Sequence, residues 1–127
     1  MSSEAEKTIL VVDDSPSVRA VLSDMLEEEG YKSMEAADGQ EGMRLVDYIK
    51  FDLIITDLTM PVMDGFEFIR QAKKHPNCKF VPIVVLTSEE DTQRLQEAKN
   101  AGASTSLTKP FKANQLRAML KMVVGGK

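Results

Sequence analysis

Residues 8–14 read Thr8-Ile9-Leu10-Val11-Val12-Asp13-Asp14, an apolar run that ends in two carboxylates. The run shows no polar alternation, which is typical of a strand covered on both faces of a parallel sheet. Three further runs, 53–56, 83–86 and the weaker 105–107, also end in polar side chains. Those side chains are Asp57, then Thr87 and Ser88, then Thr108 and Lys109. If the runs are parallel neighbours, all of these polar groups meet at one edge of the sheet.

Helical signals separate the runs. Ser15 is a good N-cap and Pro16 suits a first helical turn, and Gly30 ends that helix. Asp38 and Glu41 resemble a capping box that opens a helix reaching residue 48. Further helices are predicted from Asp64, as a cap, to Pro76, then over 91–100 and over 113–124. The segment 91–100 is mostly polar, which indicates a helix that packs lightly.

Five strands alternating with five helices predict an α/β fold with a doubly wound five-stranded parallel sheet. The runs 8–12, 53–56 and 81–86 are the most apolar, so they belong in the middle, while 31–36 and 105–107 belong at the edges. Right-handed crossovers then favour the strand order 2-1-3-4-5. In this order the ligand site lies beyond the carboxyl ends of the first and third strands.

Composition limits the classes of function. The 127 residues, 1–127, suit a single domain, and a net charge of -4 argues against nucleic-acid binding, which needs a basic face. No apolar stretch is long enough for a membrane span, and residues 1–7 lack the apolar core of a signal peptide. Cys78 is the sole cysteine, in keeping with a reducing compartment. We therefore expect a cytoplasmic protein with no membrane or direct nucleic-acid partner.

The acidic residues at the predicted site call for a cation. Three carboxylates in one pocket repel one another by roughly 3 kcal/mol per pair at about 5 Å and an effective dielectric of about 20. Lys109 supplies one positive charge only. A hard divalent cation with oxygen ligands would offset the remainder, and Mg²⁺ suits a site that also accepts phosphate oxygens. Asp13, Asp14 and Asp57 are the predicted metal ligands.

Asp57 is the candidate nucleophile. A carboxylate can attack phosphorus and form an acyl phosphate. The protein then mainly positions the transferring group and neutralises its charge. We expect Lys109 to bind one phosphoryl oxygen and the Thr87 hydroxyl another. Thr87 and Ser88 have a simpler alternative role as caps of the following helix.

Four segments carry a family resemblance: 11–15 (VVDDS), 56–65 (TDLTMPVMDG), 86–88 (LTS) and 108–111 (TKPF). Together, and in this order, they resemble bacterial two-component response-regulator receiver domains, above all the stand-alone chemotaxis regulators. The resemblance implies a flavodoxin-like fold and a cis peptide bond between Lys109 and Pro110. It implies a histidine kinase as phosphodonor and the Thr59 backbone carbonyl as a further Mg²⁺ ligand.

The resemblance also implies how such a protein works. It would catalyse its own phosphorylation and dephosphorylation without being a turnover enzyme, and a phosphatase would be a candidate partner. Its partner surface would comprise the fourth helix, fifth strand and fifth helix, here around 94–99, 104–106, Lys112 and Gln115.

Ser106 departs from the receiver pattern. It occupies the position, three residues before Lys109, where an aromatic switch residue normally turns inward. Thr105 and Leu107 cannot replace it, because adjacent strand residues face opposite sides. The phosphorylation chemistry is expected to survive, whereas a switch based on an aromatic rotamer is not supported.

Two other residues are predicted to affect the lifetime of the phosphorylated form. Thr59 lies two residues after Asp57, and Glu89 lies two residues after Thr87. Both should flank the route by which water reaches the phosphoryl group. His75 and Cys78 are interpreted as an ordinary loop histidine and an ordinary thiol.

Two alternatives remain from the sequence. A turnover phosphatase or flavin-binding protein could share the architecture, but Thr59 stands where haloacid-dehalogenase phosphatases have a second acid, and the turn at 13–17 is acidic. The other alternative is an unphosphorylated receiver-like adaptor or a phosphate sink. The complete set of acidic, hydroxyl and lysine side chains argues against an adaptor, whereas Ser106 leaves it open.

Overall fold

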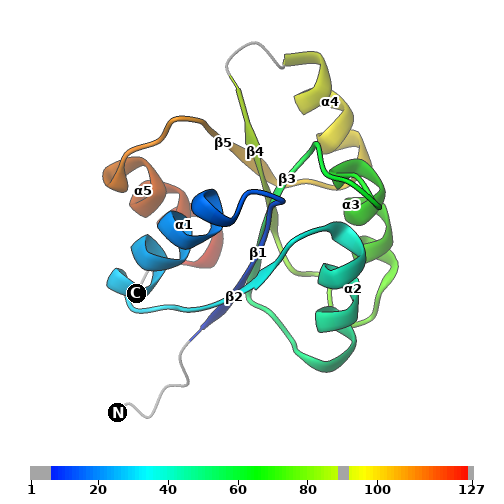
Figure 1. Cartoon of the computed structure of the whole chain (residues 1–127), viewed down its shortest axis with the longest axis horizontal. Helices are drawn as coiled ribbons and strands as arrows, with labels where there is room; N and C mark the ends of the chain where they lie inside the picture. Colours follow the sequence, from blue (N-terminus) through cyan, green and yellow to red (C-terminus); the bar gives the residue numbers. More distant parts are fainter. Residues whose placement is uncertain (1–6, 89–91, 126–127) are drawn as a thin grey trace.

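A five-stranded parallel sheet forms the centre of the molecule, with the strand order β2-β1-β3-β4-β5 (Figure 1). The computed structural model describes residues 7–88 and 92–125. Its elements are β1 Thr8–Val12, α1 Pro16–Glu28, β2 Lys32–Ala36, α2 Gly39–Tyr48, β3 Leu53–Asp57, α3 Gly65–Lys74, β4 Ile83–Thr87, α4 Thr92–Ala101, β5 Thr105–Thr108 and α5 Ala113–Val124. The predicted α/β architecture and flavodoxin-like strand order are confirmed.

Burial explains which strands are central. Every residue of β4, and all but the last of β3, is buried, whereas β2 and β5 are only partly covered. A strand with helices on both faces can keep apolar side chains on both faces, but an edge strand meets solvent. The prediction that the two more polar strands, β2 and β5, lie at the edges of the sheet is therefore confirmed.

The helices form two layers. Figure 1 shows α1 and α5 on one side of the sheet and α2, α3 and α4 on the other. One buried cluster joins α1 and α5 to the sheet through Leu22, Leu26, Leu116 and Leu120. The second cluster includes Val46, Phe68, Ile69 and Ala98 from the three helices opposite. This sandwich leaves the carboxyl ends of the strands free for a site.

Predicted caps begin three of the helices. The side chains of Ser15, Asp38 and Asp64 accept hydrogen bonds from backbone N–H groups in the first turns of α1, α2 and α3. Glu41 also reaches back, but its carboxylate accepts from the N–H of Ala37 rather than from that of Asp38. Asp64 is thus a helix cap, as predicted.

The fourth strand is the main difference in element bounds. The sequence predicts it from residue 81, whereas β4 begins at Ile83. The N–H of Val81 donates to the carbonyl of Cys78 within a turn, and Pro82 has no N–H to contribute to a ladder. Asp91, the predicted start of the fourth helix, lies outside the described residues.

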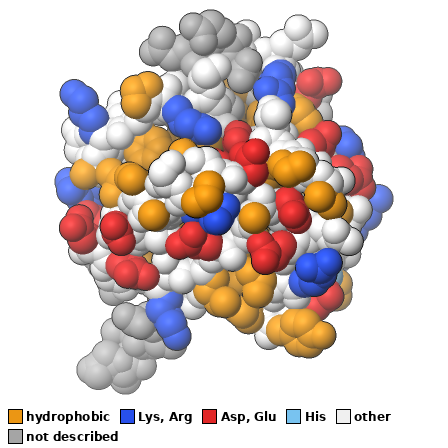
Figure 2. Space-filling model, viewed as in Figure 1, with side chains coloured by type: hydrophobic (Ala, Val, Ile, Leu, Met, Phe, Trp, Pro, Cys, Tyr) orange, Lys and Arg blue, Asp and Glu red, His pale blue; other side chains and the backbone are white. Residues whose placement is uncertain are grey.

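The face shown in Figure 2 carries acidic, basic and hydrophobic side chains interspersed with one another. None of the helices in the described part of the chain has the length and apolar character needed to cross a membrane.

Candidate functional site

Strand register brings the predicted site residues to one edge of the sheet. Val12 pairs with Thr56, Asp57 with Leu86, and Thr87 with Thr108. Because the strands are parallel, the residues that follow them leave the sheet in the same direction. Asp13, Asp57 and Lys109 therefore meet although they are far apart in sequence.

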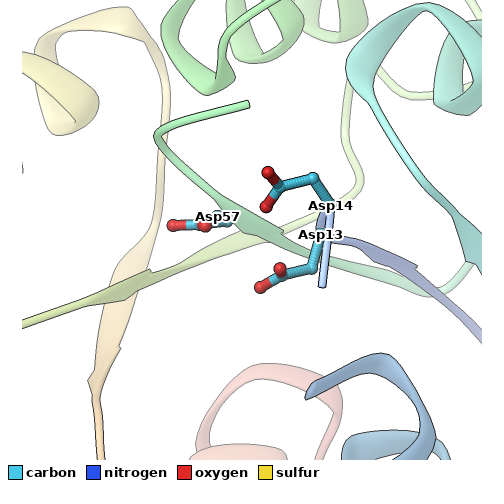
Figure 3. A group of neighbouring side chains, drawn as sticks. All are labelled: Asp13, Asp14 and Asp57. Atoms are coloured by element: carbon cyan, nitrogen blue, oxygen red, sulfur yellow. The ribbon is translucent and has the colours of Figure 1, made fainter. Parts of the chain in front are cut away.

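Three carboxylates cluster at this edge (Figure 3). Asp13, Asp14 and Asp57 each have an oxygen within 4.8 Å of the others. Asp13 is buried, Asp57 is partly buried and Asp14 is exposed. The cluster thus runs from the protein interior to solvent, as a site open to a ligand requires.

Asp13 is the most constrained of the three. Its Oδ1 atom accepts a hydrogen bond of 2.9 Å from the N–H of Ser15. Its Oδ2 atom is buried and has no hydrogen-bond partner within the described residues. Burial raises the pKa of Asp13 above the usual range; the charges of Asp57 and Asp14 add to this effect, while Ser15 and Lys109 oppose it. A buried carboxylate oxygen without a donor is well suited to bind a cation.

Asp57 is held by the backbone around it. Its Oδ1 atom accepts a hydrogen bond of 2.7 Å from the N–H of Leu58. The N–H of Gly65 donates to the carbonyl of Leu58, which brings the start of α3 against the end of β3. A Cβ atom at Gly65 would lie 2.3 Å from the Asp57 carbonyl oxygen, so this approach requires glycine.

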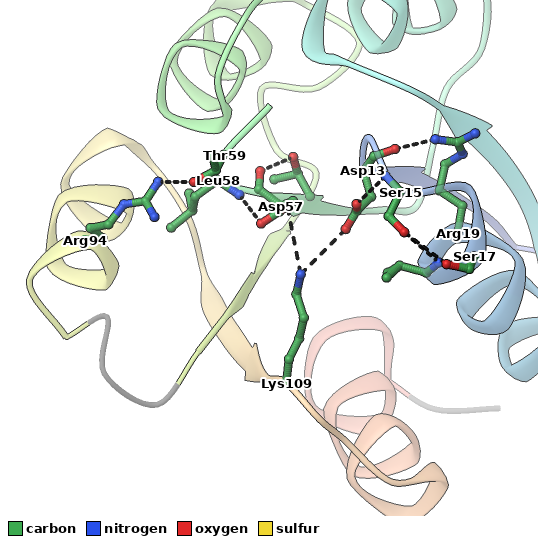
Figure 4. A network of polar contacts seen from close by, with 11 residues as sticks. Asp13, Ser15, Ser17, Arg19, Asp57, Leu58, Thr59, Arg94 and Lys109 are labelled. Carbon is green, nitrogen blue, oxygen red and sulfur yellow. Dashed lines mark hydrogen bonds and ion pairs between the residues drawn. The ribbon is translucent and has the colours of Figure 1, made fainter. Parts of the chain in front are cut away.

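Lys109 lies between the acids (Figure 4). Its Nζ atom is 3.8 Å from Oδ2 of Asp13 and 3.8 Å from Oδ2 of Asp57. Its backbone N–H donates to the carbonyl of Thr87 at 2.7 Å, and the bond to Pro110 is cis as expected. The sheet therefore fixes the backbone of Lys109, and the long side chain of this lysine reaches the carboxylates.

The hydroxyl-bearing residues near the site differ in how deeply they are buried. Thr87 is buried at the end of β4, whereas Ser88 is exposed. Ser106 is half-buried on β5, and its neighbour Leu107 joins the core formed with α1 and α5. Thr59 is exposed beside the site, and Glu89 lies outside the described residues.

Two arginines contact the site in ways that the sequence did not predict; Arg19 was not singled out, and Arg94 was placed only on the partner surface. Arg19 in α1 donates to the backbone carbonyl of Asp13 at 2.5 Å and pairs with Glu35 of β2. Arg94 in α4 donates to the Thr59 hydroxyl at 2.7 Å. Arg19 could have been noticed because it lies one helical turn after Ser15, the cap that follows Asp13 and Asp14. Arg94 gave no comparable signal because its partner is 35 residues away in the sequence.

His75 and Cys78 lie away from this edge. His75 ends α3, where its Nε2 atom lies 2.9 Å from a carboxylate oxygen of Asp47 and its Nδ1 atom accepts from the N–H of Asn77. Cys78 is fully buried in the core, and burial raises the pKa of its thiol to about 11.

Comparison with known proteins gives the family. The sequence model for the response regulator receiver domain matches residues 9–121. The chain belongs to the receiver domain family. A probable chemotaxis protein CheY from Rhizobium etli is 37% identical over 123 residues, which cover 95% of each chain.

Solved receiver structures agree in fold. Chemotaxis protein CheY4 of Vibrio cholerae superposes with a TM-score of 0.89 at 41% identity, covering 94% of this chain and 99% of that one. The receiver domain of sensor histidine kinase PA1611 from Pseudomonas aeruginosa superposes at 0.88 with 32% identity, covering 96% and 100%. That structure has a magnesium ion coordinated in its active-site cleft.

Membership of the receiver domain family gives the class of function to which the acidic cluster belongs. Receiver domains are signalling proteins that take phosphate from histidine kinases and contact downstream partners. They bind Mg²⁺ through an acidic cluster, which in this receiver domain comprises Asp13, Asp14 and Asp57. The carboxylate oxygens fit such an ion, above all the Asp13 Oδ2 atom, which accepts no hydrogen bond from the described residues.

Proposed function

We propose that this receiver domain is a phosphoacceptor response regulator that receives a phosphoryl group on Asp57 from a histidine kinase. The observation that carries the proposal is the position of Lys109 Nζ, 3.8 Å from an oxygen of Asp13 and 3.8 Å from one of Asp57. The Asp13 oxygen is buried and accepts no hydrogen bond from any described residue. Such a pocket is deficient in positive charge until a cation binds, and it then suits an anionic phosphoryl group.

Mg²⁺ would be held by the side chains of Asp13, Asp14 and Asp57 and by the backbone carbonyl of Thr59. When bound, the ion supplies charge neutralisation for the carboxylates and for the phosphoryl oxygens. The support in this chain is the set of hard oxygen donors within 4.8 Å of one another. The magnesium of the Pseudomonas aeruginosa receiver domain, also in an active-site cleft, favours the same assignment.

The transfer step needs one nucleophile and two positioning groups. A carboxylate oxygen of Asp57 attacks phosphorus, a P–O bond forms, and the P–N bond of the donor phosphohistidine breaks with its electron pair returning to the imidazole nitrogen. Lys109 offsets negative charge on the transferring group, and the buried Thr87 hydroxyl donates to one of its oxygens.

Return to the starting state is a hydrolysis. Water attacks phosphorus, the P–O bond to Asp57 breaks, and inorganic phosphate leaves while the carboxylate is restored. The domain thus catalyses its own modification and its removal without turning over a separate substrate. A phosphatase that acts on the same bond is a further proposed partner. Thr59 and Glu89 are proposed to set the rate of this hydrolysis, and replacement of both by alanine should alter it.

The output is proposed to be a protein–protein contact in the cytoplasm, of the chemotaxis type named for the Rhizobium etli relative. The proposed partner surface comprises α4, β5 and α5. Exposed residues Ser104, Lys112 and Gln115 lie on it, and α4 has a single buried residue, Ala98. A lightly packed helix can change position at small cost, which suits a surface that reports the state of Asp57.

Phosphorylation by a small donor tests the function directly. The protein is incubated with Mg²⁺ and acetyl phosphate, and we expect an acid-stable, base-labile phosphate on the chain. Asp57→Asn should abolish the label, while Asp24→Asn, at an exposed acid on α1, should retain it. No label on the unsubstituted protein would favour the adaptor, for which Ser106 is the motivation, and steady phosphate release from unrelated esters would favour a phosphatase.

A further inference from the structure

A hydrogen bond between Arg94 and Thr59 joins α4 to the loop that follows the acceptor strand. The Nη2 atom of Arg94, in the first turn of α4, donates to Oγ1 of Thr59 at 2.7 Å (Figure 4). A short hydrogen bond from a guanidinium is stronger than one between neutral groups. Thr59 lies only two residues after Asp57, so the contact ends at the rim of the acceptor site.

The ring of Phe66 fixes the same guanidinium from another side. The central carbon of the Arg94 guanidinium lies 5.5 Å from the ring centroid of Phe66, in the first turn of α3. This is within the range of a cation–π contact, and the planar guanidinium can stack and donate at once. Arg94 is thereby held by α3 and directed at Thr59.

Among the described residues, α4 buries few apolar side chains. Ala98 is its one buried residue, and Leu95 packs against the core only partly. A helix with so little buried apolar area depends more on polar contacts for its position. The bond to Thr59 is therefore a specific link between α4 and the acceptor loop, and it does not pass through Ser106.

We propose that Arg94 is a positioning residue that holds the Thr59 side chain at the rim of the acceptor site and slows loss of the phosphoryl group from Asp57. The inference rests on the proposed function. A hydroxyl has two acceptor lone pairs, and Arg94 occupies one of them. The attached positive charge also makes the hydroxyl oxygen a poorer acceptor for the proton of an attacking water. Without Arg94, the Thr59 hydroxyl becomes free to orient that water.

A double-mutant cycle tests this role. The protein is labelled on Asp57 with acetyl phosphate and Mg²⁺, the donor is removed, and the first-order loss of the label is followed. Arg94→Ala should accelerate the loss about threefold to tenfold, the range that corresponds to one hydrogen bond. In the Thr59→Val background, which has no hydroxyl to release, Arg94→Ala should leave the rate unchanged.

Two further variants separate positioning from a general structural effect. Arg94→Lys retains a cationic donor and should restore most of the slow rate. Arg70→Ala removes an exposed arginine of α3 that pairs with Glu67 at 3.1 Å, away from the acceptor loop, and should match the unsubstituted protein. Thermal unfolding of each variant confirms that the fold is retained.

The outcomes distinguish this inference from the function on which it rests. If the unsubstituted protein takes up no label, the proposed function fails and the role of Arg94 falls with it. If all variants are labelled and Arg94→Ala has no effect, or accelerates the loss equally with threonine and with valine at position 59, Asp57 phosphorylation stands and the positioning role is overturned.

Discussion

The ammonium of Lys109 lies 3.8 Å from the Oδ2 atom of Asp57. The same ammonium is 3.8 Å from Oδ2 of Asp13, so it stands between two carboxylates. Direct charge-assisted hydrogen bonds are about 2.7–2.9 Å long, which means that Lys109 attracts both acids without bonding tightly to either. A lysine held this loosely can move toward a phosphoryl group when one arrives.

Lys109→Ala should slow the phosphorylation of Asp57 by acetyl phosphate by about 10²- to 10³-fold, the usual cost of losing one charged group that stabilises a transition state. The rate of label incorporation at fixed Mg²⁺ concentration measures this effect. Lys112→Ala, at an exposed lysine three residues on, should leave the rate unchanged. Equal rates for all three proteins would exclude Lys109 from the transfer step.

Asp13→Asn should stabilise the metal-free protein by about 1 kcal/mol at pH 7, because it removes a buried charge that has no hydrogen-bond donor on Oδ2 within the described residues. Chemical denaturation in the presence of a chelator measures the change. The same variant should gain less stability from added Mg²⁺ than the unsubstituted protein does, since it has lost a proposed ligand.

The effect of Asp13→Asn should depend on pH. The pKa of Asp13 is raised by burial above its ordinary 3.8, so the folded state binds a proton before the unfolded state does as pH falls. The stability cost of Asp13 is therefore present at neutral pH and is relieved as pH drops through the raised pKa. The advantage of asparagine over aspartate should shrink over that interval, and an advantage that grows would contradict the assignment.

Gly65→Ala should lower the free energy of unfolding by about 1–3 kcal/mol. The new Cβ atom would lie 2.3 Å from the Asp57 carbonyl oxygen and 2.6 Å from the Leu58 Cα atom, and neither is a flexible side-chain end. Because α3 must move away from β3, phosphorylation of Asp57 should also slow. Gln71→Ala, at an exposed position of the same helix, is the matched control for both measurements.

Cys78 should make the protein less stable at alkaline pH. Its thiol has a pKa of about 11 in the folded state against an ordinary value of 9.0, because burial disfavours the thiolate. The Cys78 thiol does not lower the free energy of unfolding below pH 9.0, and it lowers that free energy by up to roughly 3 kcal/mol as the pH rises toward 11. Cys78→Ala should show a shallower decline over this range in denaturant titrations, and an identical slope would refute the prediction.

The fold could be predicted from the sequence because its signals are local. The unbroken apolar runs at β1, β3 and β4 identify strands buried on both faces, and the caps at Ser15, Asp38 and Asp64 mark where helices begin. Parallel strands joined by right-handed crossovers permit few orders. The convergence of the strand-end residues then follows from the topology.

The exact ends of the strands could not be predicted from the sequence, because they depend on which backbone groups form hydrogen bonds with a neighbouring strand. The start of β4 at Ile83 rather than at residue 81 reflects the N–H of Val81 turning to Cys78 and the missing N–H of Pro82. These bonds involve residues on both sides of a turn, and apolar character alone does not distinguish a strand residue from a turn residue.

The sequence by itself determined which residue types reach the carboxyl edge of the sheet. Each of these residues ends a strand or comes just after one, and parallel pairing brings them together: Asp13, Asp14, Asp57, Thr87 and Lys109. Tertiary structure alone decided that Lys109 is shared between two acids, that Asp13 Oδ2 is buried without a donor among the described residues, and that Arg94 bonds Thr59. Strand and helix patterns arise from neighbours along the chain. Burial of a single oxygen and a bond across 35 residues arise only when separate elements pack together.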